Sequence, residues 1–304
     1  MPGFNPRNDL PDLVGKVILV TGGTAGVGAA TIIGLAQHNP EHLIFTGRNA
    51  KSAETTISHA RSAAPHVRVS FVECDLADLA SVKTAAERLL ADLKRLDVLV
   101  CNAGIFAKPA ALSKDGYEIQ FATNHLGHAL LTVKLLPLLQ STAELPDSDV
   151  RIINVSSTGW GLAPPGGFVL DKLKTTQEMP FGRLLRYGQS KLANMVYARE
   201  LAKRYPKILS FSVTPGVVET TMVTDLTFTY KILVYLTNIG RVKTAEQGTH
   251  NLLWAIGAPR DGIQRGKFYE PVGHLSSMET KASRDPTLGD KLWEWTEEEL
   301  KPFL

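Results

Sequence analysis

The chain has 304 residues, 44% of them hydrophobic, which is enough to bury a large core in one α/β domain. Its formal net charge is only +3, and 33 basic residues are dispersed among 30 acidic ones, so a nucleic-acid-binding protein is not expected. Residues 1–14 contain no basic-then-apolar signal, and Cys74 and Cys101 each end an apolar run. We therefore expect a cytoplasmic protein with reduced core thiols, without a disulfide framework or a metal site.

Short apolar runs bounded by turn residues alternate with helical patterns along the chain. The predicted strands are 16–21, 42–46, 67–73, 96–101, 150–155 and 208–213, and a further run at 266–269 follows a predicted helix over 244–256. Near-continuous hydrophobic runs such as 17–20 are typical of strands buried on both faces of a parallel sheet. The sequence predicts a single Rossmann domain over residues 1–304, an α/β fold with a doubly wound parallel sheet and helices on both faces.

Two segments interrupt this alternation, and long irregular segments in compact domains are often functional. The segment 158–182 contains Pro164 and Pro165, so it cannot form one continuous helix. The segment 217–242 is rich in aromatic and aliphatic side chains, and both segments are predicted to line a substrate pocket. Within the second, residues 226–239 are apolar but too short to span a bilayer. They are expected either to cover the site or to touch a membrane surface.

A glycine-rich turn follows the first predicted strand and precedes a helical pattern. Glycines allow a sharp turn and a close approach to a pyrophosphate, whose negative charge is favoured by the free N–H groups and dipole of the following helix. The cofactor-binding residues expected there are Thr21, Gly22, Gly23, Thr24, Gly26, Val27 and Gly28. The alternative interpretation is an ordinary tight turn between a strand and a helix.

The end of the second predicted strand distinguishes between two dinucleotides. An acidic residue there would bind the ribose 2′-hydroxyl of NAD, whereas an arginine accommodates the 2′-phosphate of NADP. The segment 45–49 has no acid and contains Arg48, with Lys51 close behind it. The expected cofactor is therefore NADP(H); the alternative for Arg48 is a solvated side chain at a strand end.

Tyr187 and Lys191 are four residues apart in a helical pattern, which places a phenol and an ammonium group on one face. An unperturbed tyrosine titrates near a pKa of about 10, and a neighbouring positive charge is expected to lower that value and make the phenol a better acid. Taken alone, the pair has an ordinary alternative, a lysine extended beside a half-buried tyrosine.

In their order along the chain, these motifs resemble the short-chain dehydrogenase/reductase family from Gly15 to about Glu270. The positions that match the family outside the glycine-rich turn, and that the resemblance implies as cofactor-binding or catalytic, are Asp75, Leu76, Asn102, Ala103, Gly104, Asn124, Ser157, Tyr187, Lys191, Pro215, Gly216, Val218 and Thr220. The stretch 124–128 is most similar to the retinol-dehydrogenase-like branch and related fungal reductases.

The resemblance implies a catalytic tetrad of Asn124, Ser157, Tyr187 and Lys191. Tyr187 would exchange a proton with a carbonyl oxygen as hydride is transferred, and the Ser157 hydroxyl would stabilise the same oxygen. Lys191 would bind the nicotinamide ribose and lower the pKa of the phenol, while Asn124 would hold a water that links the lysine to solvent. Ser156 is the alternative to Ser157, which we choose because the family uses the second of two serines.

The expected function is an NADP(H)-dependent oxidoreductase, a ketoreductase that acts on a bulky apolar carbonyl compound or secondary alcohol such as a steroid, a retinoid or a secondary metabolite. The alternative is a catalytically idle dinucleotide-binding scaffold protein. Ser157 and Tyr187 are thirty positions apart, further than in compact family members, which implies an insertion that either lines the substrate mouth or blocks a helical interface. Both a monomer and a homo-oligomer are consistent with this. His125 and His128 are assigned to ordinary packing.

Overall fold

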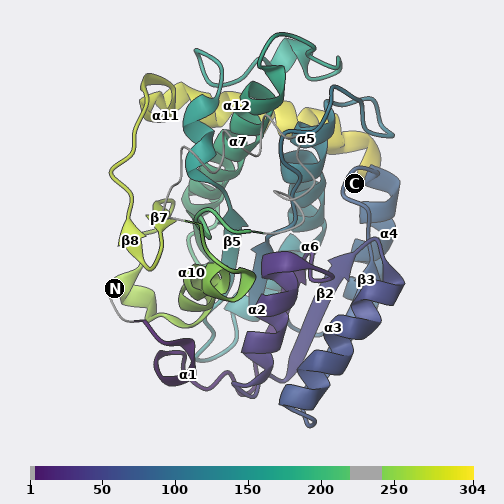
Figure 1. Cartoon of the computed structure of the whole chain (residues 1–304), viewed down its shortest axis with the longest axis vertical. Helices are drawn as coiled ribbons and strands as arrows, with labels where there is room; N and C mark the ends of the chain where they lie inside the picture. The colour runs from purple at the N-terminus through teal and green to yellow at the C-terminus, as the bar shows by residue number, and fades with distance from the viewer. Residues whose placement is uncertain (1–3, 220–241) are drawn as a thin grey trace.

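A mostly parallel sheet of eight strands forms the centre of the computed structural model, which describes residues 4–219 and 242–304 (Figure 1). The strand order is β3-β2-β1-β4-β5-β6-β7-β8, and only β8 is antiparallel to its neighbour. The strands are β1 (Val17–Thr21), β2 (His42–Gly47), β3 (Arg68–Glu73), β4 (Val98–Cys101), β5 (Arg151–Val155), β6 (Leu209–Val213), β7 (Phe268–Glu270) and β8 (His274–Leu275). The predicted doubly wound parallel sheet is confirmed, and the short hairpin strand β8 is an addition to it.

Helices cover both faces of the sheet, as predicted, and two hydrophobic clusters fill the space beneath them. On one face lie α2 (Gly26–Ala36), α3 (Ala50–Ala63) and α10 (Ala245–Gly257). On the other lie α4 (Leu79–Asp92), α6 (Gly127–Ala143), α7 (Gly182–Arg204) and α12 (Pro286–Leu300). The remaining short elements are α1 (Pro6–Asp9), α5 (Ile119–Phe121), the π-helical turn η1 (Ala122–Leu126), the 3₁₀ turns η2 (Thr158–Leu162), η3 (Leu170–Lys172), η4 (Arg260–Gly262) and η5 (Lys301–Phe303), and α11 (Lys281–Arg284).

Polar side chains mark where several of these helices begin. Asn49 accepts the N–H of Ser52 at the start of α3, and Thr244 forms a reciprocal capping box with Gln247 at the start of α10. This cap explains why the predicted helix over 244–256 is found at nearly the same bounds. By contrast, the N-cap position of α2 is Ala25, which offers no side-chain cap, so the first N–H groups of the helix are left for another partner.

The helix α12 was not predicted, although it completes the cover of α7. Trp293 stacks on Tyr197 of α7, with ring centroids 5.2 Å apart, and the Arg204 guanidinium lies 4.3 Å from a Trp293 ring. Asp285 caps the helix and Pro286 occupies its first turn, which is a start signal that the sequence analysis did not use. In Figure 1 this helix crosses behind α7 near one end of the molecule.

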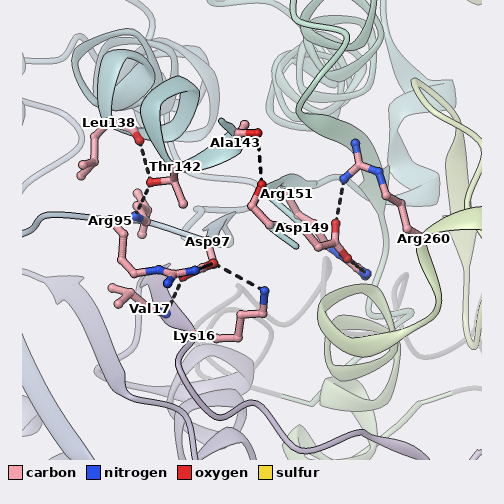
Figure 2. A network of polar contacts seen from close by, with 12 residues as sticks. Lys16, Val17, Arg95, Asp97, Leu138, Thr142, Ala143, Asp149, Arg151 and Arg260 are labelled. Carbon is pink, nitrogen blue, oxygen red and sulfur yellow. Dashed lines mark hydrogen bonds and ion pairs between the residues drawn. The ribbon is translucent and has the colours of Figure 1, made fainter. Parts of the chain in front are cut away.

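The amino ends of the central strands are joined by a polar network, shown in Figure 2. The fully buried Asp97 accepts the main-chain N–H of Val17 at 2.9 Å and the Arg95 Nε–H at 3.0 Å, and Lys16 lies 3.5 Å away. Arg151 pairs with Asp149, as Figure 2 also shows, and donates to the main-chain oxygen of Ala255 at 2.8 Å, which ties β5 to α10. These bonds lie at the amino ends of the parallel strands, opposite the carboxyl ends at which doubly wound sheets bind their ligands.

Candidate active site

A cavity of about 790 Å³ opens at the carboxyl ends of the parallel strands. Ligands of doubly wound sheets bind at this edge, near the point where the strand order reverses between β1 and β4. The predicted site residues that line the cavity are Gly22, Thr24, Gly26, Val27, Gly28, Arg48, Asp75, Leu76, Asn102, Ala103, Gly104, Ser157, Tyr187, Lys191, Pro215, Gly216 and Val218. Thr220 and the segment 226–239 lie outside the described residues.

The backbone of the glycine-rich turn is packed so closely that Gly22 and Gly28 leave no space for a Cβ atom. Gly22 has a φ of +71°, and a Cβ there would lie 2.9 Å from the Cα of Ala103. A Cβ on Gly28 would lie 2.2 Å from the carbonyl oxygen of Gly22. Because α2 begins just here without a side-chain cap, the turn and the free helix N-terminus form a cradle that fits a pyrophosphate.

Thr21 and Gly23, which were expected to bind the cofactor, do not line the cavity. The Thr21 hydroxyl accepts the main-chain N–H groups of Asn102 and Ala103, both at 2.9 Å. A Cβ on Gly23 would lie 2.5 Å from that of Phe45, so this glycine allows the turn to pack on β2. Both residues therefore support the cradle without lining the cavity. The spacing of a motif does not separate such supporting residues from those that line a site.

Arg48 lines the cavity at the end of β2, and its side chain is exposed to solvent. Asp75 lines the same cavity from the loop after β3 and accepts the main-chain N–H of Ala77 at 3.0 Å. Lys51 is exposed and does not line the cavity. Arg48 is thus the basic side chain on this part of the wall, among the residues that the structure describes.

Ser157 and Tyr187 meet at the other end of the cavity. The Ser157 hydroxyl lies next to the Tyr187 ring and lowers the pKa of its phenol, and it accepts the main-chain N–H of Gly159 at 3.1 Å. Ser156 instead donates to the main-chain oxygen of Lys191 at 2.7 Å, so its hydroxyl faces α7. The structure therefore brings Ser157, and not Ser156, to the phenol.

The local environment shifts the pKa of both Tyr187 and Lys191. Burial raises the pKa of Tyr187 to about 12, with the Ser157 hydrogen bond acting in the opposite direction. Burial lowers the pKa of Lys191 to about 8. The prediction that the ammonium lowers the phenol pKa is not met here, because Lys191 Nζ lies 5.9 Å from the centre of the Tyr187 ring and donates to the oxygen of Val155 at 2.9 Å.

Asn124 lies behind the cavity wall, on the π-helical turn η1 that precedes α6. Its side-chain oxygen accepts the N–H of Ile105 at 2.7 Å, and its amide nitrogen donates to the Ile105 oxygen at 3.0 Å and to the Ser190 hydroxyl at 2.9 Å. A Cβ on Gly104 would lie 3.1 Å from Asn124 Oδ1 and 3.3 Å from Lys191 Nζ. Asn124 and Lys191 therefore face each other across this glycine.

A buried ion pair next to Tyr187 was missed by the sequence analysis. Arg186 lies 3.1 Å from Glu118, and both side chains are almost completely buried. The same guanidinium donates to the main-chain oxygens of Gln177 at 2.9 Å and Lys108 at 3.2 Å. It thus ties α7 to the insertion and to the loop after β4. An arginine beside a tyrosine on an amphipathic helix gave no signal that it is buried.

The insertion before α7 is irregular, as its prolines require, and contains the turns η2 and η3. Only its first turn lines the cavity, through Thr158, Gly159 and Leu162. The buried Leu173 packs in the cluster beneath α12, and a Cβ on Gly167 would lie 3.0 Å from Leu288. The rest of the insertion therefore extends toward the C-terminal helices. Of the segment 217–242, residues 217 and 218 line the cavity and residues 220–241 lie outside the described part.

Comparison with known proteins agrees with this geometry. The chain is 35% identical over 306 residues to a short-chain dehydrogenase/reductase of Aspergillus calidoustus, covering 96% of each protein. It is 41% identical over 230 residues to an uncharacterized oxidoreductase of Schizosaccharomyces pombe, covering 74% of this chain and 67% of that protein. Among solved structures, a putative uncharacterized protein of Mycobacterium paratuberculosis has a TM-score of 0.73 at 28% identity over 96% of each chain.

A short-chain dehydrogenase/reductase of Serratia marcescens has a TM-score of 0.66 at 25% identity, covering 88% of this chain and all of that one. The family model of the short chain dehydrogenases matches residues 16–169, from the start of β1 into the insertion. With the cradle, the Ser157–Tyr187 pair and these matches together, the chain belongs to the short-chain dehydrogenase/reductase family.

Proposed function

We propose that this oxidoreductase is an NADP(H)-dependent ketoreductase, which reduces a carbonyl group of a bulky apolar small molecule. The family uses nicotinamide dinucleotides on small-molecule substrates, which sets the class of reaction. The observation that supports the proposal best is the cavity itself. It has a backbone cradle and Arg48 at one end and Ser157 and Tyr187 at the other.

Arg48 supports NADP(H) as the cofactor. Its cationic side chain is at the end of β2, where the adenosine ribose of a dinucleotide lies in this fold, and it can bind a 2′-phosphate. No acidic side chain follows β2 in the segment 45–49 to hold a 2′-hydroxyl instead. NADPH, when bound, supplies the hydride for the reaction.

The remaining chemistry is proton transfer and charge stabilisation by the chain. Ser157 donates a hydrogen bond to the carbonyl oxygen as negative charge develops there, and Tyr187 gives that oxygen its proton. Because its pKa is raised to about 12, the phenol is protonated at neutral pH and is ready to act as an acid. Lys191 would bind the nicotinamide ribose. Asn124 would hold the water that links Lys191 to solvent and so allows the proton to be replaced.

The outer wall of the cavity supports an apolar substrate. Phe106 packs edge-on against Tyr187, with ring centroids 4.6 Å apart, and Leu162 and Leu184 extend the same wall. Lys108 is the cationic residue at this outer wall in the part of the chain that the structure describes. A ring-containing ketone would bury its apolar surface here with its carbonyl at Ser157 and Tyr187.

The test measures consumption of NADPH with aromatic ketones, ketosteroids, retinal and quinones. Tyr187→Phe is expected to bind NADPH as the wild type does and to lose about 10²–10⁴-fold in kcat. Arg48→Asp is expected to shift the preference toward NADH, and Lys51→Gln serves as its matched control because Lys51 is outside the cavity wall. Full activity of Tyr187→Phe would rule out the proton-transfer role. Tight NADPH binding by a wild type without any turnover would instead favour a dinucleotide-binding scaffold.

A further inference from the structure

A buried histidine of α6, His128, connects Thr21 at the end of β1 to the main chain of Asn124. His128 Nε2 is 2.8 Å from the Thr21 hydroxyl at the end of β1, and His128 Nδ1 is 3.0 Å from the main-chain oxygen of Asn124. The imidazole is almost fully buried, with an exposed fraction of 2%. His128 had been assigned to ordinary packing, yet both of its ring nitrogens have defined polar partners.

The partners of the ring fix where its proton lies. A main-chain oxygen can only accept, so Nδ1 must carry the hydrogen that is donated to Asn124. Burial lowers the pKa of His128 to about 4, so the ring is neutral at physiological pH and Nε2 is an acceptor.

The hydroxyl of Thr21 completes this pattern, because it already accepts two N–H groups, from Asn102 and Ala103. Its own hydrogen is therefore free to be donated, and His128 Nε2 is the nearest acceptor at 2.8 Å. The Val100 oxygen is more distant at 3.4 Å. Every donor and acceptor of this chain of bonds has a partner of the right kind, which is the condition under which a buried polar network specifies one geometry.

Two halves of the site meet at this ring. Toward Thr21, the bonds lead to the loop after β4, whose Asn102 and Ala103 line the cofactor cavity. Toward Asn124, they hold the π-helical turn η1. The Asn124 side chain on this turn binds Ile105 and faces Lys191 across Gly104. We propose that His128 is a positioning residue for the hydride-transfer site. It fixes the position of the loop after β4 relative to the π-helical turn that carries Asn124. This inference rests on the proposed function.

Two substitutions separate the halves. In His128→Asn, the new amide N–H lies where Nδ1 was but the side chain cannot reach Thr21. In His128→Gln, the side chain reaches the former Nε2 position but leaves the main-chain oxygen of Asn124 without its donor. His128→Asn is therefore expected to weaken NADPH binding about tenfold while kcat changes less than threefold, the loss of about one hydrogen bond. His128→Gln is expected to keep its affinity for NADPH and to lose about tenfold in kcat.

His125 offers the matched control, because it is also buried and lies on the π-helical turn that precedes α6. It contacts the aromatic rings of Phe121 and Tyr197 instead of Thr21. His125→Asn and His125→Gln are expected to lower thermal stability without splitting affinity from kcat. The proposal is overturned if the His128 variants lose affinity and kcat together, in proportion to lost stability, as these controls would.

A measurement on the intact wild type guards against variants that fail to fold. In protein labelled with ¹⁵N-histidine, His128 should be a neutral ring protonated on Nδ1 at pH 7, and the opposite tautomer would contradict the proposal. Titration with NADPH, and with NADH as a second probe, reports the affinity without any substrate. If the wild type binds dinucleotide but reduces no carbonyl, the proposed function fails while the affinity of His128→Asn still tests the role of His128.

Discussion

The ammonium of Lys191 donates a 2.9 Å hydrogen bond to the main-chain oxygen of Val155, at the carboxyl end of β5. The same oxygen also accepts the side-chain amide of Asn194 at 3.1 Å. No carboxylate pairs with Lys191 in the described part of the chain, and burial lowers its pKa to about 8. The site thus holds a cation in an environment that disfavours its charge.

Replacement of Lys191 by an apolar residue should stabilise the cofactor-free protein. Lys191→Met is expected to raise the free energy of unfolding at pH 7 by on the order of 2 kcal/mol, because the Val155 oxygen keeps its bond from Asn194. Between the folded pKa of about 8 and the ordinary value of 10.5, the unfolded chain retains the proton that the folded chain loses. Wild-type stability gains from this group as pH rises, so the advantage of the variant should shrink across that window.

Urea denaturation of both proteins at pH 7, 8 and 9 measures that advantage. The difference between variant and wild type cancels the titration of Cys74 and Tyr187, because Lys191 does not shift the pKa of either group. A constant difference at all three pH values would show that Lys191 does not carry a depressed pKa in the folded state.

Ser157→Ala should change the pH dependence of the reaction as well as its rate. The Ser157 hydrogen bond lowers the pKa of Tyr187, against the larger effect of burial, so its loss should raise that pKa further. Alcohol oxidation needs the phenolate and should increase with pH, with its rising limb displaced to higher pH in the variant. Carbonyl reduction at neutral pH should fall about 10²–10³-fold. Steady-state pH profiles in both directions check this, and superimposable oxidation limbs would contradict it.

Arg186→Met should destabilise the protein and disturb substrate binding. The variant leaves the buried Glu118 without its cation and frees the oxygens of Gln177 and Lys108, at an expected cost of about 3–5 kcal/mol. Burial already raises the pKa of Glu118. Combining Arg186→Met with Glu118→Gln should therefore cost less than the sum of the single changes. A double-mutant cycle by chemical denaturation measures the coupling, and simple additivity would show that the pair is not an anchor.

Asp97→Ala tests the network of Figure 2 at the edge of the sheet far from the cavity. The main-chain N–H of Val17 would lose its acceptor while Arg95 and Lys16 still reach solvent, so we expect a loss of about 1–3 kcal/mol. The exposed pair of Glu298 and Lys301 is the control, for which Glu298→Ala should cost less than about 1 kcal/mol. Equal losses would mean that burial does not distinguish the two sites.

The fold could be predicted because its signals are local. Strands buried on both faces appear as unbroken apolar runs, and polar caps such as Thr244 mark helix starts, so the predicted strand and helix bounds differ little from those observed. The spacing of Tyr187 and Lys191, together with the family resemblance that also implied Ser157, identified three residues that line one end of the cavity. The shift in the pKa of Tyr187 was predicted in the wrong direction, because burial of the phenol and the bond of Lys191 to Val155 depend on tertiary packing.

Other features depend on contacts between distant residues and left no pattern to follow. The role of Thr21 as a link between loops is set by Asn102, which comes from a different strand end. The pairing of Arg186 with Glu118 joins two elements that are far apart in sequence. In each case the residue type was visible, while its partner was determined only when the sheet and helices had assembled.

The packing of α12 on α7 has a consequence for the order in which the protein matures. The helix α7 receives part of its cover from Trp293 and Leu292, which are synthesised well after Tyr187. During translation, the strands and the glycine-rich turn of the first half can emerge from the ribosome and associate early. In a nascent chain α7 therefore gains its full packing only after residues 286–300 have been synthesised, later than β1 and the glycine-rich turn can pack.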